Sequence, residues 1–141
     1  MELNVKRHSK TAKLPVRAHQ GDLGYDIFAD EDKWIPSGEY KLISTGISVK
    51  CSNGRWGWII KDRSSMAVKG LFTHAGVIDA GYTGKIKVLF HNVSATSIKI
   101  EQGDKIAQLI PTQVVSFEVE DVKELHNTHR GENGFGSTGI K

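Results

Sequence analysis

The chain has 141 residues and a formal net charge of +3 at pH 7, with 38% hydrophobic and 25% charged residues. This length fits one domain with a core of its own, and the composition excludes a disordered chain. No apolar run approaches the roughly 18 residues of a membrane-spanning helix, so no membrane partner is predicted. Lysines and arginines are scattered along the chain, and the charge therefore predicts no nucleic-acid partner.

Two further features concern the compartment. The N-terminal stretch carries charged residues with no apolar block behind them, which is not the pattern of a secretory signal. Cys51 is the single cysteine and cannot close an internal disulfide. We expect a cytoplasmic protein, or one of the host-cell cytoplasm if the chain is viral.

Short apolar stretches follow one another along the chain, separated by turns rich in Gly, Pro and Asn. Strands are predicted over residues 3–5, 21–28 (a turn leading into a strand), 33–35, 39–44, 47–50, 55–60, 85–92, 98–100 and 105–111. Val115, Phe117 and Val119 alternate with polar residues in the same way. Asn53-Gly54 predicts a hairpin turn, and Trp56, Trp58 and Ile60 share one face beyond it. This pattern predicts an all-β antiparallel sandwich or jelly roll.

One helix is predicted, over residues 62–70, with a length of about two turns. Asp62, Ser64 and Ser65 offer N-cap oxygens, and Gly70 is suited to the position just after the C-cap. Arg63 stands with the two serines beside the free N–H groups of the helix start. This is either an anion site, which the helix dipole would favour, or a plain cap with a surface arginine.

The stretch from Gly76 to Gly84 delivers one carboxylate, Asp79, to a turn rich in small residues. Val77 and Ile78 precede it, and Tyr82 follows three residues later. We expect a tight hairpin in which the glycines take positive φ or approach a ligand closely. Either the aspartate caps its own turn, or it is a base placed beside a pocket for a flat ring.

Gln108 falls in register with Ile106 and Ile110, so its amide lies along an otherwise apolar face. A buried amide must find partners, and these are either backbone groups at a strand edge or a phosphate oxygen. Asp22 and Asp26 are two carboxylates in an early turn. They are expected either to hold a water or metal shell or to stabilise the turn. The six histidines have no zinc-like spacing.

The apolar rhythm stops at His126, and the residues after it are polar and rich in glycine. Successive N–H groups around Gly136, Ser137 and Thr138 are suited to form a nest for an anion. Phe135 offers a face for stacking, and Arg130 supplies a forked positive charge. The alternative is a frayed terminus.

Together these clusters resemble the five motifs of the trimeric dUTPase family, in the family's order and across most of the chain. The matching segments are residues 24–27, Arg63-Ser64-Ser65, residues 76–84, residues 103–109, and Arg130 with residues 134–139. The resemblance implies a jelly-roll domain over residues 1–125 and a mobile arm over residues 126–141. It implies a homotrimer with shared active sites, and Mg²⁺-dependent hydrolysis of dUTP to dUMP and pyrophosphate.

The resemblance also implies a role for each matched residue. Asp79 is the general base for the water that attacks the α-phosphorus, and Tyr82 packs under the deoxyribose. Backbone groups of the hairpin, near Gly76 and Lys87, read the uracil. The phosphate chain is held by Ser64, Ser65 and Gln108, with Arg130 on the γ-phosphate, Phe135 over the uracil, and Gly136, Ser137 and Thr138 around the phosphates. Asp26 meets the magnesium through water.

The chain departs from the common pattern in two places. Asp62 stands where a proline usually precedes the arginine, and Ala80-Gly81 replaces the usual acidic pair before the tyrosine. Both changes lean toward the related dCTP deaminases, but the glutamate that deamination needs is matched here by Leu89, which cannot carry protons. Hydrolysis of dUTP is therefore the first hypothesis. The alternatives are a deaminase-related enzyme and a non-catalytic nucleotide-binding regulator of the same fold.

Overall fold

A computed structural model describes residues 1–141, and almost all of its regular structure is β, as the sequence predicts. The elements are β1 (Leu3–Arg7), β2 (Tyr25–Phe28), β3 (Lys33–Ile35), β4 (Tyr40–Ser44), β5 (Ile47–Cys51), β6 (Trp56–Asp62), α1 (Ser64–Ala67), β7 (Leu71–His74), β8 (Val77–Ile78), β9 (Lys87–Asn92), β10 (Ile98–Ile100) and β11 (Lys105–Gln113). No helix has the length and apolar character needed to cross a membrane.

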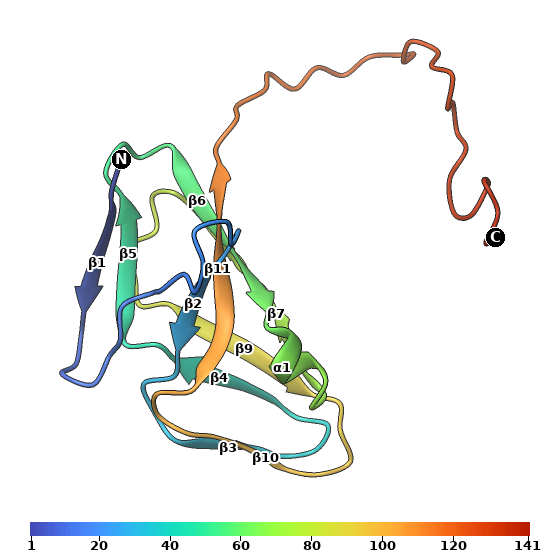
Figure 1. The fold of residues 1–141 in the computed structure, drawn as a ribbon. Helices are drawn as coiled ribbons and strands as arrows, with labels where there is room; N and C mark the ends of the chain where they lie inside the picture. Colours follow the sequence, from blue (N-terminus) through green and yellow to red (C-terminus); the bar gives the residue numbers. More distant parts are fainter.

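The strands form four antiparallel sheets, which Figure 1 shows packed into one β body. The two larger sheets have the orders β2-β11-β6-β8 and β4-β9-β7, and the smaller ones are the pairs β1-β5 and β3-β10. Strands far apart in sequence lie side by side, since β2 and β6 both pair with β11. This connectivity is that of a jelly roll rather than a series of hairpins.

One hydrophobic cluster of 19 buried residues joins these sheets. Trp58 and Ile60 of β6 are buried and Trp56 is half-buried, which confirms the shared face predicted from their spacing. Val88 and Phe90 of β9 are fully buried by the same alternation. Each such side chain contributes about 1.5–3 kcal/mol to folding, so the core sets the register of both large sheets.

The helix is shorter than predicted. It covers only Ser64–Ala67, and Asp62 belongs to the end of β6. No side chain caps the helix, because the Asp62 carboxylate instead accepts hydrogen bonds from Thr73. Gly70 does take a positive φ of 90° and donates its N–H to the Ala67 carbonyl, so it ends the turns that follow the helix.

Neither of the two predicted hairpins is a hairpin in the structure, because each turn connects strands of different sheets. The Asn53-Gly54 turn is present, with Gly54 at φ 66°, but β5 and β6 on either side of it lie in different sheets. The loop of residues 79–86 likewise connects β8 to β9, which do not pair with each other. None of the glycines at 76, 81 and 84 takes a positive φ; the residue that does so there is Ala75, at 50°.

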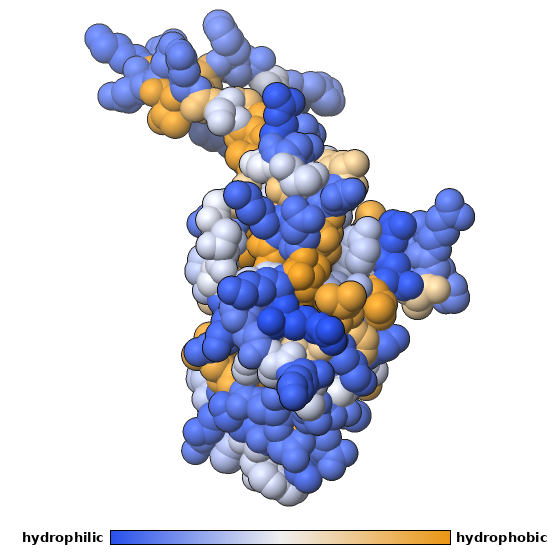
Figure 2. Space-filling model, turned by 90° about the vertical axis from the view of Figure 1, so that its left-hand side faces the viewer, coloured by the Kyte–Doolittle hydropathy of each residue, from blue (hydrophilic) through white to orange (hydrophobic).

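An arm without regular structure follows β11, and Figure 1 shows it extending away from the body. The last hydrogen bond to the body runs from the Val114 N–H to the Arg55 carbonyl, so residues 115–125, ahead of the predicted arm of residues 126–141, also make no hydrogen bond to the body. Phe117 and Val119 are 83% and 97% exposed. The alternating pattern of residues 115–119 forms no strand in the single chain, because no strand edge lies beside it. Figure 2 shows apolar surface on the arm and on the body beneath it.

Candidate active site

The predicted residues fall into three separate places, and the first is a hollow beside Asp79. It is lined by Val77, Ile78, Asp79, Tyr82, Lys85, Ile86 and Lys87. Asp79 is exposed, and its carboxylate makes no hydrogen bond or ion pair within the chain. The turn is closed by its backbone instead, because the Tyr82 N–H donates to the Asp79 carbonyl at 3.0 Å. The side chain therefore does not cap its own turn and is free to act on a ligand.

Tyr82 is fixed within this hollow. Its hydroxyl donates to the Lys85 carbonyl at 3.2 Å. Its ring also lies close to the backbone of Gly84, where an added Cβ would be 2.5 Å from Cζ and 3.0 Å from Cε2 of the tyrosine. The glycine is therefore needed for the ring's approach and not for a positive φ.

Gly76 does not line the hollow, whereas Lys87 does. The Gly76 carbonyl accepts the Ile60 N–H at 2.7 Å, and an added Cβ would meet the Ile60 carbonyl oxygen at 2.5 Å. Close backbone approach thus explains this glycine, and its carbonyl is already used by β6. Lys85 and Ile86, which sequence reasoning missed, also line the hollow.

The second place is an ion-pair cluster at the far end of β6. Arg63 Nε donates to Asp26 Oδ1 at 3.0 Å, and Nη1 donates to Ser65 Oγ and to the Lys105 carbonyl, both at 3.2 Å. Lys105 Nζ lies 3.1 Å from Asp26 Oδ2. With its side chain only 14% exposed, Asp26 holds two cations and fixes the guanidinium beside the helix start.

Gln108 belongs to this second cluster. Its Nε2 donates to the Asp62 carbonyl at 3.1 Å. Of the two partners considered for this amide, a backbone group and a phosphate oxygen, the single chain therefore provides the backbone group. The side chain also fills the space over Gly24, where an added Cβ would lie 2.6 Å from Gln108 Oε1. Ser64 is exposed nearby, at the first position of α1. The structure thus brings Arg63, Ser64, Ser65 and Gln108 to the same end of β6.

The two places lie at opposite ends of β6. Trp58 pairs with Ile78, which puts Asp79 beside Gly57. Arg63 follows the other end of the strand, six residues beyond Gly57. A strand rises about 3.3 Å per residue, so these positions are roughly 20 Å apart along β6. Within one chain, Asp79 and the Arg63 cluster are therefore too far apart to contact the same atom of a ligand.

The arm residues form the third place. Arg130 Nε donates to the Asn133 carbonyl at 2.9 Å, and Ser137 donates its N–H to the Gly134 carbonyl at 3.0 Å. Phe135 is fully exposed at φ 46°, and Gly136 follows at φ 85°. These are local turns of the arm. In the single chain none of these residues touches the Asp79 hollow or the Arg63 cluster.

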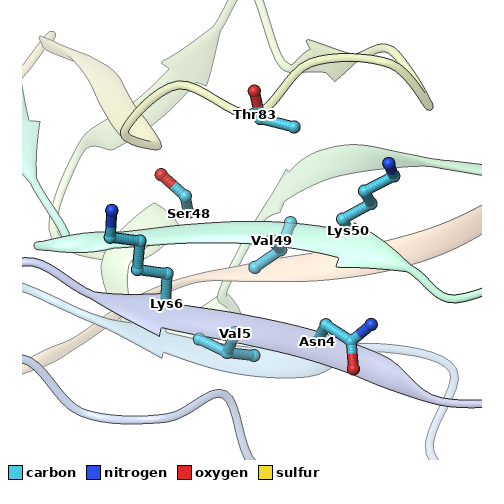
Figure 3. A pocket seen from close by; sticks show the side chains of 7 residues that line it. All are labelled: Asn4, Val5, Lys6, Ser48, Val49, Lys50 and Thr83. Atoms are coloured by element: carbon cyan, nitrogen blue, oxygen red, sulfur yellow. The ribbon is translucent and has the colours of Figure 1, made fainter.

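A further hollow lies between the loop of residues 79–86 and the strands β1 and β5 (Figure 3). It is lined by Asn4, Val5, Lys6, Ser48, Val49, Lys50 and Thr83. Ser48 is buried, with its hydroxyl 2.8 Å from His8 Nε2. None of the predicted site residues lines this hollow.

Fold and site together define an all-β protein whose free carboxylate and cationic cluster are suited to a phosphorylated ligand. Comparison with known proteins gives the family. The dUTPase family model matches residues 10–139, and the chain belongs to the dUTPase family.

Curated relatives match over nearly the whole chain. The deoxyuridine 5'-triphosphate nucleotidohydrolase of Paramecium bursaria Chlorella virus 1 is 44% identical over 139 residues, covering 98% of each chain. That of Candida albicans is 42% identical over 140 residues, covering 97% of this chain and 87% of the relative.

Solved structures give the same fold. A mutant dUTPase of Staphylococcus bacteriophage 80alpha, solved with dUpNHpp, superposes with a TM-score of 0.90 at 30% identity, covering 99% of both chains. A mutant dUTPase of phage phi11 of S. aureus, described with a structural Mg(II) ion, has a TM-score of 0.82 at 27% identity, covering 90% of this chain and all of that one. The jelly-roll fold and the family resemblance are confirmed.

Proposed function

We propose that the protein hydrolyses dUTP to dUMP and pyrophosphate, with Mg²⁺, in the cytoplasm of its cell or host cell. The reaction would remove dUTP from the nucleotide pool and supply dUMP for dTMP synthesis. The observation that carries this proposal is the free carboxylate of Asp79 in a hollow that also holds the fixed ring of Tyr82. Membership of the dUTPase family supports the choice of substrate.

The roles of the hollow follow from its geometry. A general base must lie within hydrogen-bond reach of its water, and it must not be neutralised by a partner in the chain. Asp79 meets the second condition, since no cation pairs with it. The Tyr82 ring would pack under the deoxyribose and exclude a 2′-hydroxyl, as the family resemblance implies. Lys87, which also lines the hollow, would read the base with its backbone.

The second cluster would hold the phosphate chain. The Arg63 guanidinium has its Nε and Nη1 groups engaged, which leaves Nη2 without a partner in the chain. Ser64 and the N–H groups at the start of α1 face solvent. The arm would complete the site with Arg130 on the γ-phosphate, Phe135 over the uracil, and the Gly136-Ser137-Thr138 turn around the phosphates. Such preorganised donors stabilise the charge that moves during phosphoryl transfer.

The chain provides no metal cage of its own. No group of three His, Cys, Asp or Glu side chains lies close enough together to hold an ion. Arg63 and Lys105 each pair with one oxygen of Asp26, and we propose that its contact with magnesium passes through water. Magnesium bound to the triphosphate would neutralise part of its charge, and magnesium commonly keeps waters and substrate phosphates as ligands.

We propose that the complete site forms between copies, in a homotrimer. The roughly 20 Å along β6 between Asp79 and Arg63 is too long for both to serve one α-phosphorus within a chain. The arm also leaves its own body, with exposed apolar residues that need a surface to cover. A site built from Asp79 of one copy, the Arg63 cluster of a second copy and an arm would bring the separated groups to one substrate. It would also give the exposed arm a surface to cover.

The function is tested by measuring pyrophosphate release from dUTP, dCTP, UTP and dTTP side by side, with and without Mg²⁺. We expect release from dUTP alone at low enzyme concentration, and its loss when the metal is chelated. Ammonia release from dCTP would instead indicate a deaminase. Tight binding of dUTP without turnover would indicate a nucleotide-binding regulator.

A further inference from the structure

Asp62 links three elements at the end of β6. Its Oδ1 accepts two hydrogen bonds from Thr73 of β7, one from the backbone N–H and one from the hydroxyl, both at 2.7 Å. Its backbone carbonyl accepts the Gln108 amide of β11 at 3.1 Å. The side chain is partly buried, so solvent does not readily replace these partners.

These bonds fix the residue that immediately precedes Arg63. On the other side of Arg63, Asp26 and Ser65 hold the guanidinium. The backbone of residues 62–63 is thus held from β7 and β11 while the arginine side chain is held from β2 and α1. A loss of the two carboxylate bonds would untie the backbone of residues 62–63 from β7, and this backbone includes the carbonyl that accepts the Gln108 amide.

A negative charge beside a triphosphate site carries an electrostatic cost, because like charges repel. The geometry of Asp62 explains why the chain keeps an acceptor there. The carboxylate engages only Oδ1, and an amide oxygen accepts the same two bonds. The hydrogen bonds and the charge are therefore separable by substitution.

We propose that Asp62 is a positioning residue for phosphate binding, which sets the Arg63 turn and the Gln108 amide through its hydrogen bonds to Thr73. This inference rests on the proposed function, in which the Arg63 cluster holds the phosphates. It assigns Asp62 no contact with the substrate. The requirement is for an acceptor at Oδ1, not for a negative charge.

The test measures equilibrium affinity of the full-length protein for dUMP and for a non-hydrolysable α,β-imido analogue of dUTP. We expect Asp62→Ala to weaken binding of the imido analogue about tenfold, the size of one to two lost hydrogen bonds, and to leave dUMP affinity unchanged. In turnover, KM for dUTP should rise by a similar factor. Asp62→Asn keeps the acceptor, so it should bind the analogue at least as tightly as the parent.

Glu31→Ala is the matched control. Glu31 Oε1 also accepts a backbone N–H, from Ser44 at 2.8 Å, but none of the site residues lies in contact with it. Both alanine variants are expected to lower Tm, and only Asp62→Ala should change affinity for the analogue. Equal loss of dUMP and analogue binding, an unchanged affinity in Asp62→Ala, or a loss in Asp62→Asn as large as in Asp62→Ala would overturn the inference.

The test of Asp62 can be decided separately from the test of dUTP hydrolysis. A parent protein that binds the imido analogue but releases no pyrophosphate from dUTP would refute the hydrolysis, and the Asp62 comparison would still be decided by affinity. A parent that binds no triphosphate analogue would refute both.

Discussion

At the scale of single residues, the free carboxylate of Asp79 leads to the simplest prediction. Asp79→Asn keeps the size of the side chain and removes its basicity, so kcat for dUTP should fall by roughly a hundred- to ten-thousandfold. Affinity for the imido analogue should stay near that of the parent, because no structural contact of this side chain is lost. Steady-state kinetics and calorimetric titration measure the two quantities. Turnover at the parental rate would show that Asp79 is not the base.

Gly84 and Gly81 give a second test at this scale, within one loop. Gly84→Ala would place a Cβ 2.5 Å from Cζ of Tyr82, so the ring must move, whereas a Cβ at position 81 meets nothing within 4 Å. We expect Gly84→Ala to raise KM for dUTP about tenfold or more and to narrow the preference for dUTP over UTP. Gly81→Ala should behave like the parent. Equal behaviour of the two variants would remove Tyr82 from sugar recognition.

At the scale of elements, the sequence predicts strands and buried faces well, and pairing poorly. The alternation of Trp58 and Ile60, and of Val88 and Phe90, identifies the core side of β6 and β9 because side chains in a strand have a period of two. That period does not say which neighbour a strand takes. The Asn53-Gly54 turn and the Asp79 loop therefore suggested hairpins, although each connects two different sheets.

The same limit applies to the site. Asp79, Arg63 and Gln108 could be singled out as polar side chains in apolar or turn-forming surroundings. The ion pairs of Asp26 with Arg63 and Lys105 could not be predicted from the sequence. These residues lie at the ends of three strands, and they are close together only because β11 lies between β2 and β6. Thr73 as the partner of Asp62 was missed for the same reason.

The arm is the element whose removal is most informative. Deleting residues 126–141 should lower kcat/KM for dUTP by roughly a hundredfold or more, since it removes Arg130 and the phosphate nest. Tm should not change, because the arm makes no hydrogen bond to the body beyond Val114. Ile140→Ala, in the same exposed arm but outside the predicted nest, is the control and should retain activity. An unchanged kcat/KM after the deletion would exclude the arm from the mechanism.

At the scale of the whole molecule, the separation along β6 predicts that two defective chains can restore one another. Asp79→Asn and Arg63→Ala should each be inactive alone. After the two are unfolded together and refolded, a site that takes Asp79 from one and Arg63 from the other is intact, so roughly a quarter of parental activity should return by random mixing. Refolding each variant separately is the control, and no recovery in the mixture would place both groups in one chain's site.

The length of β6 also has a consequence for how much protein a cell must make. A single chain carries the Asp79 carboxylate beside one end of this strand and the Arg63 cluster, the proposed phosphate site, at the other. Specific activity should therefore drop on dilution, and scarce chains should leave nucleotides untouched. In the proposed homotrimer, the length of β6 would therefore make catalysis depend on the concentration of chains, because a single chain could not form a complete site.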